Sequence, residues 1–152
     1  MPPGEYVPDS TEGITRVRDL PRPVVQRRSR DYRRRCCPHC GRGCYRDSQG
    51  HRTLHDLGCP DRDRPRDLHV QYSKHRCQAC GLYFSADMSG LALPGSHYTQ
   101  RVISLAVRLV AEDGLPFRVA SWHLWRDHRV FVPFATIQNW VEAAGGKSGL
   151  AS

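Results

Sequence analysis

Two copies of one short motif, a pair of cysteines closed by a glycine, carry the clearest chemistry in this sequence. They occupy residues 37–41 (CPHCG) and 77–81 (CQACG), and 36 residues lie between Cys40 and Cys77. Each CxxC turn directs two thiolates at one point, and the glycine that follows allows a left-handed turn. Four sulfurs complete the tetrahedron that Zn²⁺ accepts and leave no open coordination position. The motifs therefore predict one structural zinc ion per chain, bound by Cys37, Cys40, Cys77 and Cys80.

Other uses of the cysteines are less well supported. A redox-active CxxC is expected once, at the start of a helix that follows a strand, whereas both copies here lie in turn-rich sequence. The chain has seven cysteines, and an odd number argues against a framework of disulfides. A second metal site would have to use Cys44, His51, His55 and Cys59, in a stretch that has strand character.

The metal site requires elements that bring its two halves together. Residues 36–84 are predicted to form a zinc ribbon of short antiparallel strands, with strands at residues 52–57 and 68–76. In the second of these, Leu68, Val70 and Tyr72 alternate with polar residues, which is the period of a half-buried strand. A hairpin that returns the chain to the metal accounts for the long separation of the two motifs. Phe84 is expected to pack against the ribbon.

Three helices are predicted after a linker at residues 85–98, which is rich in glycine and proline. Thr99 is expected to cap the first helix, which ends at the Asp-Gly pair of residues 113–114. The second helix is expected from about residue 116 to 127, with Trp122 and Trp125 as core or interhelical anchors. The third is predicted to follow Pro133, to end at residues 145–146 and to bury Ile137, Trp140, Val141 and Ala144.

The order of these helices is typical of a helix-turn-helix domain, predicted here over residues 99–146, whose last helix enters the major groove. With the apolar residues facing inward, Ala135, Thr136, Gln138 and Asn139 lie on the outer face of the third helix. An amide side chain offers the paired donor and acceptor that reads adenine. Arg118, Arg126 and Arg129 are expected to hold phosphates beside this helix. A plain helical bundle or dimerisation module with a polar face is the alternative interpretation.

Arginine dominates the charge of the chain. There are 23 basic and 15 acidic residues, for a formal net charge of +8, and Lys74 and Lys147 are the only lysines. The planar guanidinium group suits bidentate contact with phosphate or guanine. Residues 1–35 are predicted to be a disordered basic arm that contacts DNA through Arg33, Arg34 and Arg35, and residues 147–152 a disordered tail. A solvated basic surface without a partner is the alternative.

The composition also argues against a membrane location. The sequence has no apolar run of the roughly 18 residues that would span a bilayer, and its start lacks the apolar core of a secretory signal. We therefore expect a cytoplasmic, nucleoid-associated protein without a membrane partner. The predicted fold class is α+β, with a small ribbon followed by a three-helix domain.

Taken together, five segments resemble the N-terminal part of bacterial insertion-sequence transposases. In chain order they are CPHCG, HDLG, YSKHRCQACGLYF, YTQRVISLAVRLVAEDGLP and FVPFATIQNWVEAAG, within residues 36–146. In that family a zinc ribbon and a helix-turn-helix recognise the terminal inverted repeats of the element. The resemblance implies zinc ligation by the four cysteines, and DNA reading by the helix at residues 134–144.

The resemblance stops before the catalytic part of these transposases. Their ribonuclease-H-like domain needs well over ~100 residues and three carboxylates that converge on metal ions, whereas only residues 147–152 follow the last predicted helix. We therefore expect a DNA-binding portion and no enzyme. Its expected partner is double-stranded DNA, with a second copy or a full-length transposase as a further partner. An oligomerisation or adaptor module of a DNA-processing assembly is the rival function.

Overall fold

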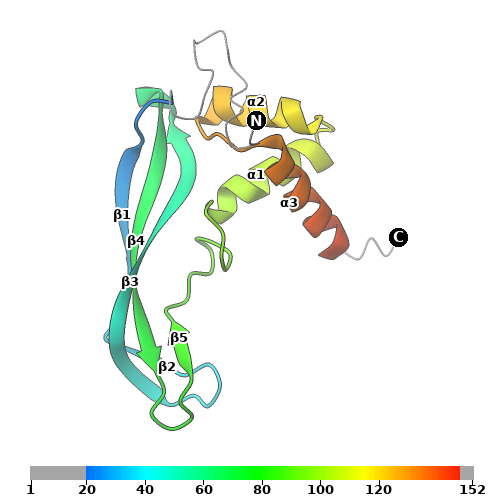
Figure 1. The fold of residues 1–152 in the computed structure, drawn as a ribbon. Coiled ribbons are helices and arrows are strands. Elements are labelled where there is room, and N and C mark those ends of the chain that lie inside the picture. Colours follow the sequence, from blue (N-terminus) through cyan, green and yellow to red (C-terminus); the bar gives the residue numbers. More distant parts are fainter. Residues whose placement is uncertain (1–19, 148–152) are drawn as a thin grey trace.

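The computed structural model describes residues 20–147 and has the α+β class that the sequence predicts. A sheet of five strands forms a long twisted ribbon, and three helices gather at one end of it (Figure 1). The strands are β1 (Val24–Arg30), β2 (Arg34–Cys36), β3 (Gly43–Cys59), β4 (Arg64–Arg76) and β5 (Tyr83–Ser85). The helices are α1 (Gln100–Ala111), α2 (Phe117–His128) and α3 (Phe134–Lys147).

The centre of the sheet is an antiparallel hairpin of β3 and β4, and both strands are longer than predicted. Their ladder runs from Arg46 opposite His75 to Cys59 opposite Arg64, and the 3-10 turn Pro60–Arg62 closes it. At about 3.3 Å per residue, the 13 residues of β4 span roughly 40 Å. The two cysteine motifs therefore lie at one end of the hairpin and the helices at the other.

The prediction of a disordered arm over residues 1–35 is wrong for its described part. β1 pairs in parallel with β4, and β2 pairs antiparallel with β3, so both belong to the sheet. Sheet pairing uses backbone groups, and Arg27 and Arg28 keep their side chains in solvent, so an arginine-rich strand costs little here. Residues 1–19 and 148–152 lie outside the described residues.

β4 changes the face that it buries about halfway along its length. Leu68 and Val70 are buried on one face, whereas Ser73, His75 and Cys77 are buried on the other. Successive residues of a strand point to opposite faces, so the sheet is covered on different sides at its two ends. The predicted alternation ends at Tyr72, which is only half-buried.

The predicted linker of residues 85–98 begins with the last residue of β5, and the rest of it covers the sheet instead of spanning free solvent. Met88, Leu91 and the buried Ala92 pack against the apolar cluster of β3 and β4. The backbone N–H of His55 donates to the carbonyl of His97 at 2.8 Å, and the Arg52 guanidinium donates to two carbonyls of this segment. Glycine and proline indicated irregular backbone correctly, but irregular backbone can also pack.

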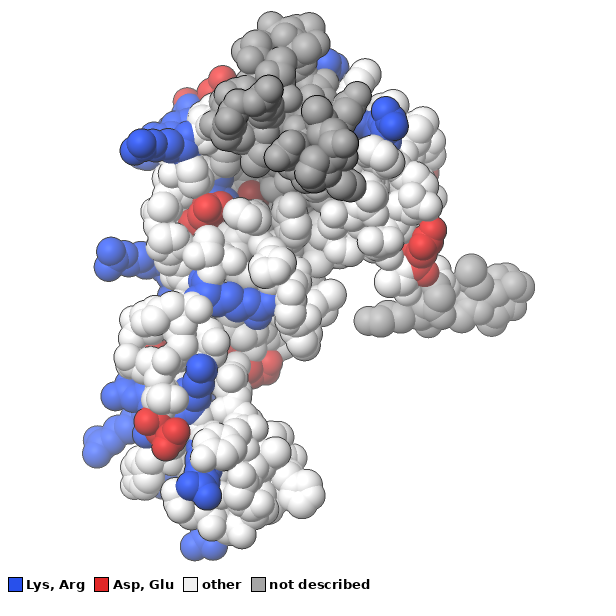
Figure 2. Space-filling view, viewed as in Figure 1, with Lys and Arg blue, Asp and Glu red and all other residues white. Residues whose placement is uncertain are grey.

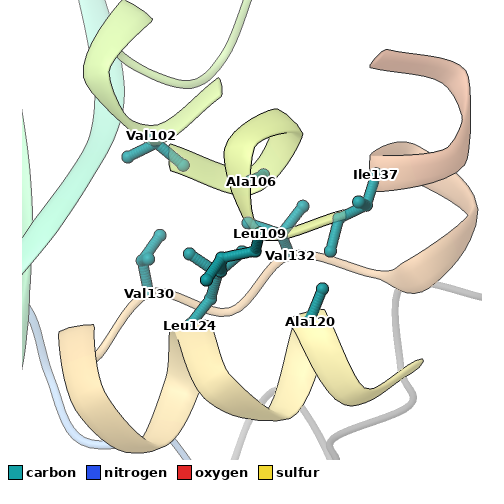
Figure 3. Packing of buried hydrophobic residues seen from close by; sticks show 8 residues of the cluster. All are labelled: Val102, Ala106, Leu109, Ala120, Leu124, Val130, Val132 and Ile137. Atoms are coloured by element: carbon teal, nitrogen blue, oxygen red, sulfur yellow. The ribbon is translucent and has the colours of Figure 1, made fainter. Parts of the chain in front are cut away.

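The helices enclose one apolar core, which is shown in Figure 3 and consists of Val102, Ala106, Leu109, Ala120, Leu124, Val130, Val132 and Ile137. The three helices start within two residues of their predicted positions, and α3 continues through the glycine pair to Lys147. Trp125 is fully buried, as predicted for an anchor, but Trp122 is 42% exposed. None of the helices in residues 20–147 is long and apolar enough to cross a membrane.

The helical unit is attached to the hairpin through a buried carboxylate. Asp56 of β3 is 1% exposed and accepts a hydrogen bond from the Thr99 hydroxyl at 2.8 Å. It also forms an ion pair with Arg101 of α1. Thr99 precedes α1 as predicted but makes no side-chain cap bond, because its hydroxyl is directed at Asp56. The two parts are therefore packed together and not merely linked.

Candidate metal centre and nucleic-acid interface

The fold brings together the four cysteines that the sequence singled out. The sulfur atoms of Cys37, Cys40, Cys77 and Cys80 all lie within 4.8 Å of one another, close enough to hold a metal ion. Cys37 Sγ is 3.7 Å from Cys80 Sγ, and Cys40 Sγ is 3.5 Å from Cys77 Sγ. Cys37 and Cys77 are buried, whereas Cys40 and Cys80 are exposed, so each motif contributes one inner and one outer sulfur.

The two motifs form nearly identical turns. In each, the glycine N–H donates to the carbonyl of the first cysteine at 2.8 Å, and φ is positive, at 77° for Gly41 and 73° for Gly81. The N–H of the first cysteine donates to the carbonyl five residues ahead, at 2.8 Å in the first motif and 2.9 Å in the second. A side chain at either glycine would strain the turn, because L residues with a Cβ rarely adopt such φ values.

Backbone N–H groups make the first cysteine of each motif the more acidic one. The N–H of Cys80, followed by neighbouring donors, lowers the pKa of Cys77 to about 6, and the N–H of Cys40 lowers the pKa of Cys37. The N–H of Leu82 favours the Cys80 thiolate, but the Cys77 sulfur and burial outweigh it and raise the pKa to about 12. Metal binding requires all four cysteines as thiolates and would therefore release the protons that they still hold.

A small core of Cys44, His75 and Phe84 supports the cysteine cluster. Phe84 packs against the buried cysteines, as predicted, and stacks on the His75 ring with centroids 5.3 Å apart. His75 is fully buried, and its Nδ1 donates to the Cys44 carbonyl at 3.0 Å while Nε2 lies 2.8 Å from Ser73 Oγ. The sequence did not single out His75 or Ser73. In the sequence, Ser73 and His75 alternate with the charged Lys74 and Arg76. This period of two is the signal that could have indicated their burial.

The remaining cysteines and histidines do not gather into a second site. Within residues 20–147, the four cysteines of the two motifs are the one group of three or more metal-ligand side chains whose atoms lie this close together. Cys59 accepts hydrogen bonds from Arg66, and His55 pairs with Asp67 at 2.9 Å. The alternative site of Cys44, His51, His55 and Cys59 is therefore not formed.

On α3, the predicted reading residues differ in exposure. Gln138 and Asn139 are exposed, whereas Ala135 and Thr136 are half-buried. Ile137 is fully buried in the helical core and sets this orientation. The amide of Gln138 donates to Glu142 one turn later, at 3.1 Å. Of the four residues, the two amides are thus the most accessible.

The three arginines predicted to flank α3 have different environments. The Arg118 guanidinium lies over the Phe134 ring, 4.6 Å from its centroid, beside the start of α3. Arg126 lies over the exposed Trp122 ring at 5.2 Å. Arg129 is only 8% exposed and binds Asp63 of the hairpin turn, with Nε 2.6 Å from the carboxylate. The prediction that Arg129 holds a phosphate is therefore not supported, because its charge is already paired with Asp63 where the helices pack on the hairpin.

Arg33, Arg34 and Arg35 lie near the cysteine cluster, at the opposite end of the hairpin from α3. The structure therefore places the predicted DNA contacts on two separate surfaces. The charge is also unequal: residues 20–98 contain 15 basic and seven acidic residues, and residues 99–147 contain six and four. Figure 2 shows most of the visible basic side chains over the ribbon and its lower end, with few on the helical unit.

Comparison of the chain with protein-family models, with curated proteins and with solved structures found no match.

Proposed function

We propose that this protein binds double-stranded DNA in a sequence-specific manner, with a helix-turn-helix formed by α2 and α3 and a zinc ribbon at the far end of the hairpin. The observation that carries the proposal is the orientation of α3. Its buried Ile137 directs Gln138 and Asn139 into solvent. The NH₂ and C=O groups of an amide side chain complement the acceptor and the donor that adenine presents in the major groove.

The surroundings of α3 support this function. Arg118 lies beside the first turn of α3, where a guanidinium group would meet the phosphates that border a major groove. Arg126 is exposed on α2 at the other side of the turn between the helices. Both side chains rest on aromatic rings, which limits the conformational entropy lost when they bind a phosphate.

We assign the metal as zinc on the chemistry and spacing of the sulfurs. Four sulfurs at about 2.3 Å from one tetrahedral ion stand about 3.8 Å apart. The two measured sulfur separations, 3.7 and 3.5 Å, are close to that value. The ion would be structural, because four thiolates leave no position for a substrate. It would join the chain just before β3 to the chain just after β4.

The zinc assignment is tested by mass spectrometry of the intact chain under native conditions. We expect one zinc ion per chain, and its loss in Cys77→Ser. Cys36→Ser is the matched control, because Cys36 is adjacent to the cluster in sequence but is exposed and outside it. Retention of zinc by Cys77→Ser, or its loss from Cys36→Ser alone, would contradict the assignment.

The DNA-binding function is tested by selecting duplexes from a random library and titrating the preferred sequence. Gln138→Ala and Asn139→Ala should each weaken binding to that duplex about tenfold, since a bidentate base contact contributes about 1–3 kcal/mol. Binding to unrelated duplexes should change little, because phosphate contacts do not read sequence. Gln78→Ala removes an exposed amide at the other end of the hairpin and should leave both affinities intact. Equal binding of all duplexes by the wild-type chain would contradict the proposal.

The resemblance to transposases suggests the natural target. We propose that the preferred duplex is the terminal inverted repeat of an insertion sequence. The test is footprinting on the two ends of an element whose transposase resembles this chain. Protection of the repeats and not of adjoining DNA is the expected result, and uniform protection would argue against this target.

A further inference from the structure

An alternating row of tyrosine and arginine crosses the sheet beside the cysteine cluster. Arg34 of β2 is directly opposite Tyr45 of β3, and Arg76 of β4 is directly opposite Tyr83 of β5. The β3–β4 ladder begins with Arg46 opposite His75, and one more residue in this register sets Tyr45 opposite Arg76. Directly opposite residues share a face, so Tyr83, Arg76, Tyr45 and Arg34 form one row across four strands.

This row is on the exposed face of the ribbon end. Tyr45 and Tyr83 are 61% and 65% exposed, and they are the most exposed large hydrophobic side chains in the described residues. The next residues along the same strands, Arg35, Cys44, His75 and Phe84, point to the opposite face, where the last three pack near the cysteine sulfurs. The two tyrosines therefore do not belong to the buried cluster that packs around the four cysteines.

Each tyrosine ring already has a cation beside it. Arg34 lies 5.6 Å from the Tyr45 centroid, and Arg76 lies 5.3 Å from the Tyr83 centroid. Cation–π contacts hold such side chains in an extended position while most of each ring stays in solvent. Two exposed rings in one row are not isolated surface residues, and grouped exposed apolar side chains mark interaction sites.

The charge around the row favours a polyanion. Residues 32–46 and 72–83 contain seven basic and no acidic residues. Asp31, Asp47 and Asp87 border these segments, and Asp31 is bound to Arg46. Four thiolates with one Zn²⁺ would carry a net charge of −2, which the seven cations outweigh.

We propose that this row, Tyr83–Arg76–Tyr45–Arg34, binds single-stranded DNA. Bases stack on the two tyrosine rings, and the arginines contact the phosphates between them. Aromatic rings interleaved with cations are the means by which proteins hold unpaired nucleotides without reading their sequence. The paired bases of an intact duplex cannot stack on side chains in this way, so the row adds an activity that reading by α3 does not require.

The test is binding of a fluorescent 20-nucleotide oligothymidylate to the full chain, followed by anisotropy. The double variant Tyr45→Ala/Tyr83→Ala should bind at least about tenfold more weakly, because each base–aromatic stack contributes about 1–3 kcal/mol. Tyr45→Phe/Tyr83→Phe should retain binding, because stacking needs the ring and not the hydroxyl. Arg34→Gln and Arg76→Gln should each lower the slope of log K against log salt by about 0.7.

Two variants remote from the row serve as controls. Arg62→Gln removes one exposed charge at the other end of the hairpin, and Trp122→Ala removes an exposed ring from α2. Both should bind oligothymidylate as the wild-type chain does. Zinc content and circular dichroism are measured for every variant, and recovery of binding in the phenylalanine pair distinguishes loss of stacking from loss of folding.

Three results would overturn the proposal: no binding of oligothymidylate by the wild-type chain, unchanged binding by the alanine pair, or equal weakening by Trp122→Ala. The inference is independent of duplex reading by α3. Gln138→Ala and Asn139→Ala should leave oligothymidylate binding unchanged, and the tyrosine variants should leave duplex sequence preference unchanged. Failure of either function can therefore be distinguished from failure of the other.

Discussion

Cys44 occupies in the first motif the place that Phe84 occupies in the second, seven residues after the first cysteine of each. Both side chains pack against the sulfur cluster. Burial raises the pKa of the Cys44 thiol, so it stays protonated at neutral pH and acts as a small apolar group. Cys44 is therefore a core residue beside the four-cysteine cluster, with the same packing role as Phe84 in the matching turn.

His55 and Asp67 form a partly exposed pair across the β3–β4 hairpin, with Nδ1 2.9 Å from the carboxylate. The hydrogen bond that His55 donates to the Asp67 carboxylate raises the pKa of His55 above its ordinary value of 6.5. A raised pKa in the folded state means that the pair stabilises the fold below about pH 6.5. This contribution is lost as the pH rises through the higher folded value.

We predict that an NMR titration of His55 will give a pKa above 6.5, and that Asp67→Asn will lower it. The stabilising effect should be small, below about 1 kcal/mol, because His55 is about half exposed. An unchanged His55 titration in Asp67→Asn would show that the carboxylate does not set the shift.

At the scale of the element, the face of α3 proposed to read bases carries one unfavourable charge. Glu142 lies one turn after Gln138 on the exposed side and accepts a hydrogen bond from its amide. If this face enters a major groove, the Glu142 carboxylate repels the phosphates. It also accepts the hydrogen bond that the Gln138 amide would otherwise donate to a base. An acidic residue in this position limits affinity and so favours release from non-preferred DNA.

Glu142→Gln should therefore strengthen duplex binding, about threefold or more at low salt, with a smaller effect at high salt. The measurement is a salt titration of binding to the selected duplex and to an unrelated one. Glu112→Gln is the matched control, since Glu112 is an exposed glutamate that follows α1 and lies far from α3 in sequence. An equal gain from both substitutions would indicate a general charge effect and not a position on the reading face.

For the molecule as a whole, the junction between hairpin and helices depends on two ion pairs, Asp56–Arg101 and Asp63–Arg129. Burial by itself raises the pKa of Asp56, but the bonds from Arg101 and Thr99 outweigh it and the net pKa is lowered. A carboxylate with a lowered pKa stabilises the folded state above about pH 4. This stabilisation is lost as the pH falls through the folded value.

Asp56→Asn should lower the free energy of unfolding by about 2–3 kcal/mol at pH 7, because it leaves Arg101 without its partner and weakens the Thr99 bond. The deficit should shrink as the pH falls from about 4 through the lowered folded pKa of Asp56, because the carboxylate is protonated first in the unfolded chain and then in the folded one. Urea unfolding at several pH values measures both effects. Asp47→Asn, at an exposed position of the same strand, should be neutral, and an equal loss in that variant would refute the special role of Asp56.

The two surfaces proposed to bind nucleic acid lie toward opposite ends of the hairpin, whose strand β4 spans roughly 40 Å. The length of β4 is comparable to one turn of duplex DNA, about 34 Å. α3 and the Tyr–Arg row can therefore act on separate parts of one nucleic acid, such as a duplex and an adjoining unpaired end. The rigidity of the junction decides whether the spacing between them is constant.

Local pattern was sufficient to predict the four converging cysteines, the three helices and the two central strands. Each depends on residues near one another in the chain: a CxxCG turn, a helical apolar period, or an alternation over a few residues. The α+β class follows from those elements. Local pattern also oriented α3, because the residue that anchors it, Ile137, belongs to the same apolar period as its neighbours.

Long-range pairing decided the rest. Residues 24–36 carry few apolar side chains, and only the backbone groups that β3 and β4 offer make them strands. In the sequence, Arg129 is one of several basic residues near the end of a helix. Its pairing with Asp63, 66 residues earlier, is set by the tertiary structure. The Tyr–Arg row exists because registers between four strands align residues from 34 to 83. Composition and periodicity contain no information about such registers, so tertiary structure alone determined them.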